Sequence, residues 1–188
     1  SDAYLAPDGG ENQLGTEHDV PPASDCSGCH GGRASGVLGF SAVQLAWDPP
    51  PGLVNVSALK AAGIVADSVP EVTLLPESEH DVEALGYLHA NCSHCHNTTR
   101  PLSEGPRCYD PQEDFNFSIP AGGVARLEDS PAYVSGIAEQ VITPGSAAQS
   151  ELIERFTGQP GGPQMPALGT EVIDPYGESL LRGWINGL

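Results

Sequence analysis

Apolar residues recur at helical spacing in two segments of the second half of the chain. In the first, Ser78 and Glu79 begin a stretch whose apolar positions are three residues apart: Val82, Leu85 and Leu88. We expect a helix that begins here and runs directly into Cys92. In the second, Asp174 or Pro175 begins the segment PYGESLLRGWINGL, in which one stripe is formed by Leu180, Leu181 and Trp184. Two such helices can cross and pack against each other.

The rest of the chain is patterned more weakly. VLGFSAVQLAW (37–47) is a short amphipathic segment that DPPPG (48–52) stops, and VSALKAAGIV (56–65) predicts a short helix ending near Gly63. Long loops rich in proline and glycine include PAGGVARLEDSP (120–131) and FTGQPGGPQMPALGT (156–170). We therefore expect a mainly α fold with long loops.

An acidic, proline-bearing run, VPEVTLLPESEHD (69–81), divides the chain into two parts. We place a flexible tether at 1–17, a short N-terminal module at 18–76 and a C-terminal domain at 77–188. Hydrophobic residues make up 39% of the chain and aromatic residues 6%, against 23 glycines and 18 prolines. The core of such a chain is thin, and a large apolar cofactor would enlarge it.

The motif Cys-x-x-Cys-His occurs twice, once in each part. Cys26-Ser27-Gly28-Cys29-His30 and Cys92-Ser93-His94-Cys95-His96 together use four of the five cysteines. This motif is the attachment signature of c-type haem, in which both thiols bond to the porphyrin and the histidine binds the iron. A shared zinc site would leave the histidine after each motif unexplained, and a thioredoxin-like pair should follow a hydrophobic strand. We expect two covalently attached c-type haems, with His30 and His96 as the proximal ligands.

The second haem has a good candidate for its sixth ligand. Met165, the only methionine, lies in the loop before the C-terminal helix. Its thioether is a soft ligand that favours ferrous iron. With the helix into the second motif, Met165-Pro166 and the C-terminal helix with Trp184, residues 77–188 resemble a class I cytochrome c domain. VLGFSAVQL and GYLHANCSHCHN also resemble a group of uncharacterised exported bacterial dihaem proteins, which implies no particular activity.

The sixth ligand of the first haem stays open among three possibilities. His18 lies upstream of the first motif and could bind its haem or one in a neighbouring copy of the protein. His89 lies three residues before Cys92, where packing or a hydrogen bond at the edge of the second haem is its alternative role. The third possibility is a vacant or water-bound iron. We expect Cys108, the odd cysteine, to be a buried or free thiol, or to pair with another molecule.

These expectations favour an electron-transfer cytochrome over an enzyme. A bis-His first haem would have a lower potential than a His/Met second haem. The alternatives are a small peroxidase-like enzyme that uses an open first iron, and a haem-stabilised assembly module of an exported complex. The net charge of −18 argues against nucleic-acid binding and favours a redox partner with a basic surface, or further copies of the chain. Nothing in the sequence predicts a membrane span. We expect export to the periplasm or cell surface, with a lipid anchor as an option outside this numbering.

Overall fold

The computed structural model describes residues 4–32, 35–46, 50–69, 78–99, 115–158, 164–167 and 171–188. Within these ranges the chain is mainly helical, with long loops and no strand beyond one isolated antiparallel bridge between Gly10 and Val20. The α-helices are α1 (Cys26–His30), α2 (Val56–Ala61), α3 (Glu79–Asn91), α4 (Pro131–Ala138), α5 (Glu151–Thr157) and α6 (Pro175–Gly187). Short 3-10 helices are η1 (Gln13–Gly15), η2 (Ala23–Asp25), η3 (Leu127–Asp129) and η4 (Ala147–Gln149). The expected mainly α fold with long loops is confirmed.

The two helices with the clearest apolar pattern form where the sequence predicted them. Ser78 is the N-cap of α3 and accepts a hydrogen bond from the Asp81 amide, and Asp174 caps α6 in the same way. The two helices pack against each other, and their contact includes a hydrogen bond from Trp184 Nε1 to Asp81 Oδ1 of 2.9 Å. The predicted short helix is also present as α2, with Gly63 in a left-handed conformation just after it.

Helices α4 and α5 form in a part of the chain for which the sequence predicted long loops and no helix. Both follow a serine N-cap, Ser130 and Ser150, and α5 ends at Gly158 in a left-handed conformation. Together with α3 and α6 they enclose the main core, whose fully buried side chains include Leu85, Leu88, Ile142, Leu181, Trp184 and Ile185. In the segment 37–46, residues 42–45 form a turn and no α-helix is present.

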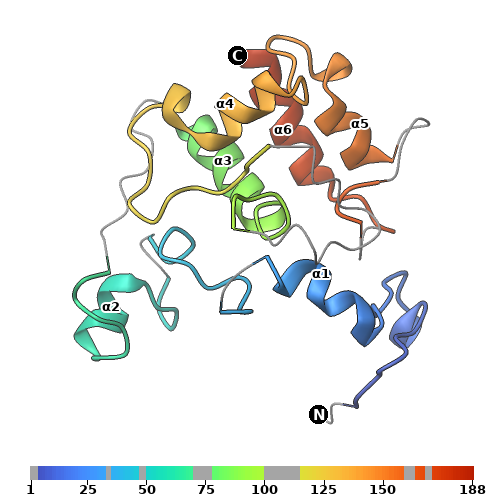
Figure 1. The fold of residues 1–188 in the computed structure, drawn as a ribbon, viewed down its shortest axis with the longest axis vertical. Helices are drawn as coiled ribbons and strands as arrows, with labels where there is room; N and C mark the ends of the chain where they lie inside the picture. The colour runs from blue at the N-terminus through green and yellow to red at the C-terminus, as the bar shows by residue number, and fades with distance from the viewer. Residues whose placement is uncertain are drawn as a thin grey trace.

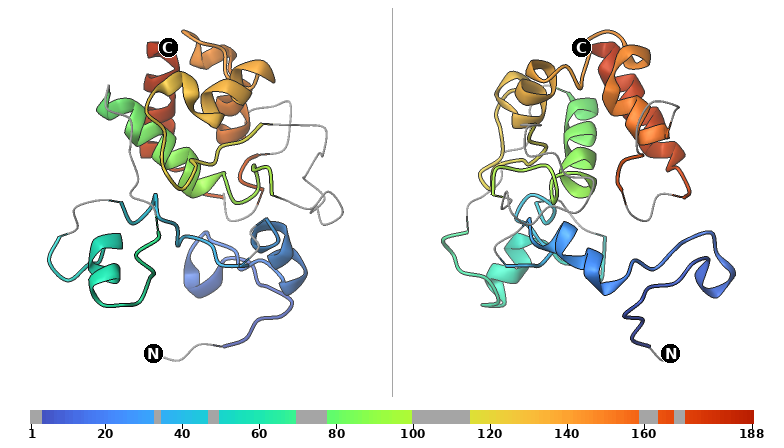
Figure 2. Two further views of the ribbon diagram at one scale, coloured as in Figure 1. Left: turned by 60° about the vertical axis from the view of Figure 1, so that its left-hand side comes forward. Right: turned by 45° about the vertical axis from the view of Figure 1, so that its right-hand side comes forward.

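The N-terminal segments lie beside this helical domain rather than within it. Figure 1 shows α1 and α2 below the group formed by α3, α4, α5 and α6, and the two views of Figure 2 agree. Val43 packs against the main core from the N-terminal part. The predicted boundary at 69–81 falls largely outside the described residues. Among the helices of the described residues, none is long and apolar enough to cross a bilayer.

Candidate functional site

Both Cys-x-x-Cys-His motifs form a turn of helix. The first is α1 itself, which η2 precedes directly. The second follows α3, where the amides of Cys95 and His96 donate to the Cys92 carbonyl oxygen over 3.1 and 2.9 Å. Residues three apart on a helical turn share one side, so the two thiols of each motif can bond to one ligand.

The ring of His30 is held by a backbone hydrogen bond. Its Nδ1 lies 2.6 Å from the carbonyl oxygen of Gly36. Because a carbonyl only accepts, Nδ1 carries the proton and Nε2 presents its lone pair. This arrangement is typical of histidines that bind a metal through Nε2, since the second nitrogen fixes the tautomer and the ring orientation. Gly36 has a φ of 65°, a conformation that glycine adopts without strain.

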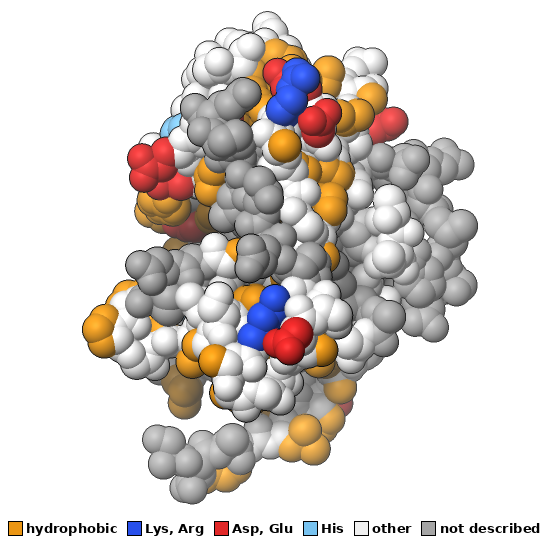
Figure 3. Space-filling view, turned by 90° about the vertical axis from the view of Figure 1, so that its left-hand side faces the viewer, with side chains coloured by type: hydrophobic (Ala, Val, Ile, Leu, Met, Phe, Trp, Pro, Cys, Tyr) orange, Lys and Arg blue, Asp and Glu red, His pale blue; other side chains and the backbone are white. Residues whose placement is uncertain are grey.

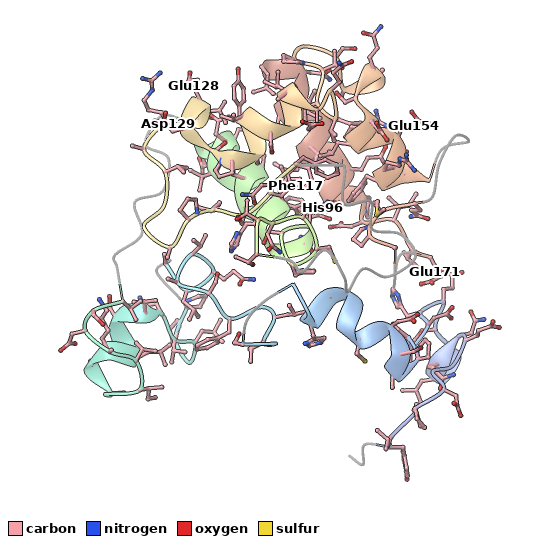
Figure 4. The ribbon with its side chains drawn as sticks, in the orientation of Figure 1. His96, Phe117, Glu128, Asp129, Glu154 and Glu171 are labelled. Carbon is pink, nitrogen blue, oxygen red and sulfur yellow. The ribbon has the colours of Figure 1, made fainter. Side chains whose placement is uncertain are left out.

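The ring of His96 lies against two phenylalanines. Phe115 stacks on it with ring centroids 4.4 Å apart, and Phe117 meets it edge-on at 5.7 Å. The Phe117 amide also donates to the His96 carbonyl oxygen over 3.0 Å. Figure 4 shows His96 and Phe117 close together at the end of α3. The second motif therefore borders an apolar, aromatic surface of the helical domain.

The two motifs meet, although 66 residues separate their second cysteines. Cys29 Sγ lies 3.9 Å from Cys95 Sγ, much farther than the roughly 2.05 Å of a disulfide bond. Beside them, the Thr99 hydroxyl lies 3.1 Å from the Gly32 carbonyl oxygen and 2.6 Å from Asn97 Oδ1, and its one proton is shared between these two acceptors. Gly32 is packed so closely that a Cβ atom there would collide with the carbonyl oxygen of His94. The loop after the first motif is thus fitted to the backbone of the second.

His89 joins the N-terminal module to the helical domain. The buried Ile119 amide donates to its Nδ1 over 2.9 Å, so the ring proton is on Nε2. That nitrogen lies 3.1 Å from Ser41 Oγ, to which it donates, and Ser41 in turn donates to Gln44 Oε1. The side chain is 4% exposed. Both ring nitrogens are thus engaged, and binding an iron through Nε2 would require the loss of the Ser41 bond.

The other two candidate ligands, Met165 and His18, make backbone hydrogen bonds within their own segments. Met165 is half-buried, and its amide donates to the carbonyl oxygen of Arg155 in α5 over 2.9 Å. His18 is exposed, and its carbonyl accepts from the Gln13 amide over 3.0 Å in the N-terminal turn. Within the part of the chain that the structure describes, neither is hydrogen-bonded to a motif residue. Cys108 lies outside the described residues.

The motif thiols differ in their surroundings. Cys26 is exposed, whereas Cys92 packs against the main core at the end of α3. Burial raises the pKa of the Cys92 thiol to about 12. Burial and the adjacent Asp174 carboxylate also raise the pKa of Tyr87, whose hydroxyl donates to Asp174 Oδ2 over 3.0 Å. The Cys92 thiol is therefore neutral at ordinary pH in this fold.

Sequence reasoning did not single out Gly32, Gly36, Thr99 or the phenylalanines beside His96. One signal was available, and it concerns Gly32. Glycines follow the first motif directly, at 31 and 32, where a close backbone approach is a common reason for glycine. No local pattern indicates that Thr99 contacts that loop.

Comparisons with known proteins provide no relative from which to infer the function. No family model, curated protein or solved structure matches this chain.

Proposed function

We propose that the protein is a dihaem c-type cytochrome that transfers electrons between exported redox partners. Cys26 and Cys29 would hold one haem, with His30 on its iron, and Cys92 and Cys95 would hold the other, with His96 on its iron. The observation that carries the proposal is that both motifs form helical turns and meet where the two parts of the chain join. The Nδ1–H tautomer of His30, with its Nε2 available, supports the same reading.

The N-terminal module also fits a chain that wraps a large apolar group. Of the hydrophobic side chains described between residues 4 and 69, only Leu59 is buried. Val37 and Phe40, which follow the first motif, are 57% and 58% exposed. Figure 3 shows hydrophobic side chains at the surface in its lower part, where the N-terminal segments lie. A haem would supply the apolar core that this module lacks.

The main alternative for the two motifs is a shared zinc site. A zinc site built from both motifs would gather four ligands around one point. Of the four motif thiols, those of Cys29 and Cys95 approach each other. Among the described residues, no group of three or more histidine, cysteine or acidic side chains gathers as a metal site would require. Two thiols 3.9 Å apart can share one zinc ion, but they are only two of the four ligands it needs, and zinc leaves the histidine after each motif unexplained.

Two further ligands belong to the proposal. Met165 would complete the second haem from the segment after α5, and His18 would complete the first, from the same chain or a neighbouring copy. When bound, each haem supplies an iron that cycles between its ferric and ferrous states. The chain would hold each iron by its axial ligands and exclude water with the side chains around them. A methionine ligand favours the ferrous state, so unequal ligand sets would give the two sites different potentials.

The acidic surface suits docking to a basic redox partner. The net charge is −18, and Figure 4 shows Glu128, Asp129, Glu154 and Glu171 at the periphery of the molecule. Such a surface attracts a basic protein over distances set by the ionic strength. Export fits the same proposal, since bacteria attach haem c outside the cytoplasm.

The test is to produce the chain with a haem-attachment system and measure its intact mass under denaturing conditions. We expect the mass of the polypeptide plus two haems. Replacing Cys26 and Cys29 by serine should remove one haem, and the Cys92 and Cys95 pair the other. Haem-free protein from a strain that loads a control cytochrome would contradict the proposal.

Spectra of the loaded protein separate electron transfer from the enzyme alternative. We expect both irons to be six-coordinate and low-spin, with no change on adding peroxide or cyanide. A high-spin signal that disappears on adding either ligand would instead favour the peroxidase-like alternative. A spectrum that changes on dilution alone would favour a ligand shared between copies, and with it the assembly module.

A further inference from the structure

The contact between the two motifs involves the second cysteine of each. Cys29 and Cys95 are the residues beside the proximal histidines, and their sulfurs are 3.9 Å apart. In a loaded protein each of these sulfurs would be bonded to its own haem. Two such sulfurs in contact would bring the edges of the two haems close together. This inference rests on the proposed function, because it concerns how the two attached groups are related.

Three backbone and side-chain features hold the motifs in this relation. Gly32 lies against the carbonyl oxygen of His94, and the Thr99 hydroxyl shares its one proton between the Gly32 carbonyl oxygen at 3.1 Å and Asn97 Oδ1 at 2.6 Å. Asn97 stabilises the turn that presents Thr99: its side-chain amide donates to the Ser93 carbonyl over 2.8 Å and its Oδ1 accepts from the Thr99 amide over 2.8 Å. The loop after the first motif is therefore seated on a stabilised turn after the second.

A second set of contacts lies apart from the motifs. Ser41 is bonded to the buried His89, and Val43 packs against the main core. With the motif contact, these anchor the N-terminal module at separate points. An arrangement fixed in this way would keep the two attachment sites in one relative position while the protein works.

We propose that the two haems form one electronically coupled pair, and that Gly32 and Thr99 are positioning residues that hold it together. Groups whose edges touch share their absorption transitions and alter each other's redox behaviour. Haems held by two independent modules would do neither.

Circular dichroism in the Soret region tests the pair directly. Two coupled haems give a couplet, with a positive and a negative lobe, that neither haem gives alone. Single-haem proteins are made by replacing Cys26 and Cys29, or Cys92 and Cys95, by serine. We expect the wild-type spectrum to contain a couplet that is absent from the sum of the two single-haem spectra. A wild-type spectrum equal to that sum, in protein with two haems, overturns the inference and leaves the proposed function intact.

The positioning residues are tested by Gly32→Ala and Thr99→Val. Both should lose at least half of the couplet amplitude while keeping two haems by mass. Matched controls are Gly86→Ala, where a Cβ meets nothing within 4 Å, and Thr98→Val, which removes the neighbouring hydroxyl. Both controls should keep the full couplet. If Gly32→Ala does not fold, Thr99→Val decides, and a full couplet in a two-haem Thr99→Val protein overturns the positioning role.

Discussion

Replacement of His89 by leucine should destabilise the protein without removing an iron ligand. The imidazole is 4% exposed and accepts a hydrogen bond from the buried Ile119 amide over 2.9 Å. Leucine has similar bulk but no acceptor, so it would leave that amide unpaired at a cost of about 1–3 kcal/mol. Loss of the bond to Ser41 would add about 0.5–1.5 kcal/mol. For a chain of this length each kcal/mol lowers the Tm by about 2–4 °C.

The assay is thermal and denaturant unfolding of the loaded protein, followed by absorbance at the Soret band and by far-UV circular dichroism. Ser41→Ala removes only the second of the two bonds, so it should cost less than His89→Leu. His80→Leu is the matched control, because His80 is exposed on the same helix and its replacement should change stability by less than about 0.5 kcal/mol. Two results would refute the reasoning: a His89→Leu protein as stable as the wild type, or the loss of a low-spin haem signal, which would make His89 an iron ligand.

Five further predictions rest on the same contacts and charges. Met165→Ala should abolish the weak red Met-to-iron absorption band and lower the potential of the second haem; a surviving band would assign the ligand elsewhere. In haem-free protein, hydrogen exchange should be fast in residues 4–69 and slow in α3 and α6, and equal protection of both parts would show that the N-terminal module folds without haem. In the same haem-free protein, an alkylating reagent at pH 8 should modify Cys26 at least tenfold faster than Cys92. Burial raises the pKa of Cys92 to about 12 in the folded protein, whereas the unfolded thiol ionises from about pH 8.5. The free energy of unfolding should therefore fall as the pH rises from about 8.5 towards 12, and a flat stability curve over that window would contradict the burial of this thiol. Finally, electron exchange with a cationic redox reagent should slow as salt is added, while exchange with an anionic one should speed up, and identical salt responses would remove the role of the acidic surface.

The elements that sequence could predict are those with a cap and a clear apolar stripe. Helices α3 and α6 each combine a polar N-cap with several apolar residues on one face, so local information suffices. Helices α4 and α5 have eight and seven residues, too few for a strong periodic signal. Their caps at Ser130-Pro131 and Ser150 were visible, but the surrounding prolines and glycines indicated loops. Short helices of this kind are stabilised mainly by packing, which a local pattern does not contain.

In the candidate site, too, the sequence predicts the features that depend on neighbouring residues and not those that depend on long-range contacts. The composition of each motif, and the helix that leads into the second, follow from residues adjacent in sequence. The meeting of the motifs does not, because Cys29 and Cys95 are 66 residues apart and no periodicity connects them. His89 shows the same limit. Its place near the second motif follows from helical spacing, whereas its bond to Ser41 spans 48 residues and depends on how the module docks.

The N-terminal module and the helical domain are therefore stabilised by different interactions. The helical domain has a core that includes Trp184, Leu85 and Ile142, and can hold its fold by apolar burial. The described residues between 4 and 69 bury only Leu59 among their hydrophobic side chains, so burial within the module stabilises it little. What fixes it are the contacts made by Gly32, Ser41 and Val43 with the larger domain, and the haem that the proposal adds. We therefore expect the module to stay docked on the larger domain rather than to move independently of it. The same dependence that makes the module weak alone is what would keep the two haems together.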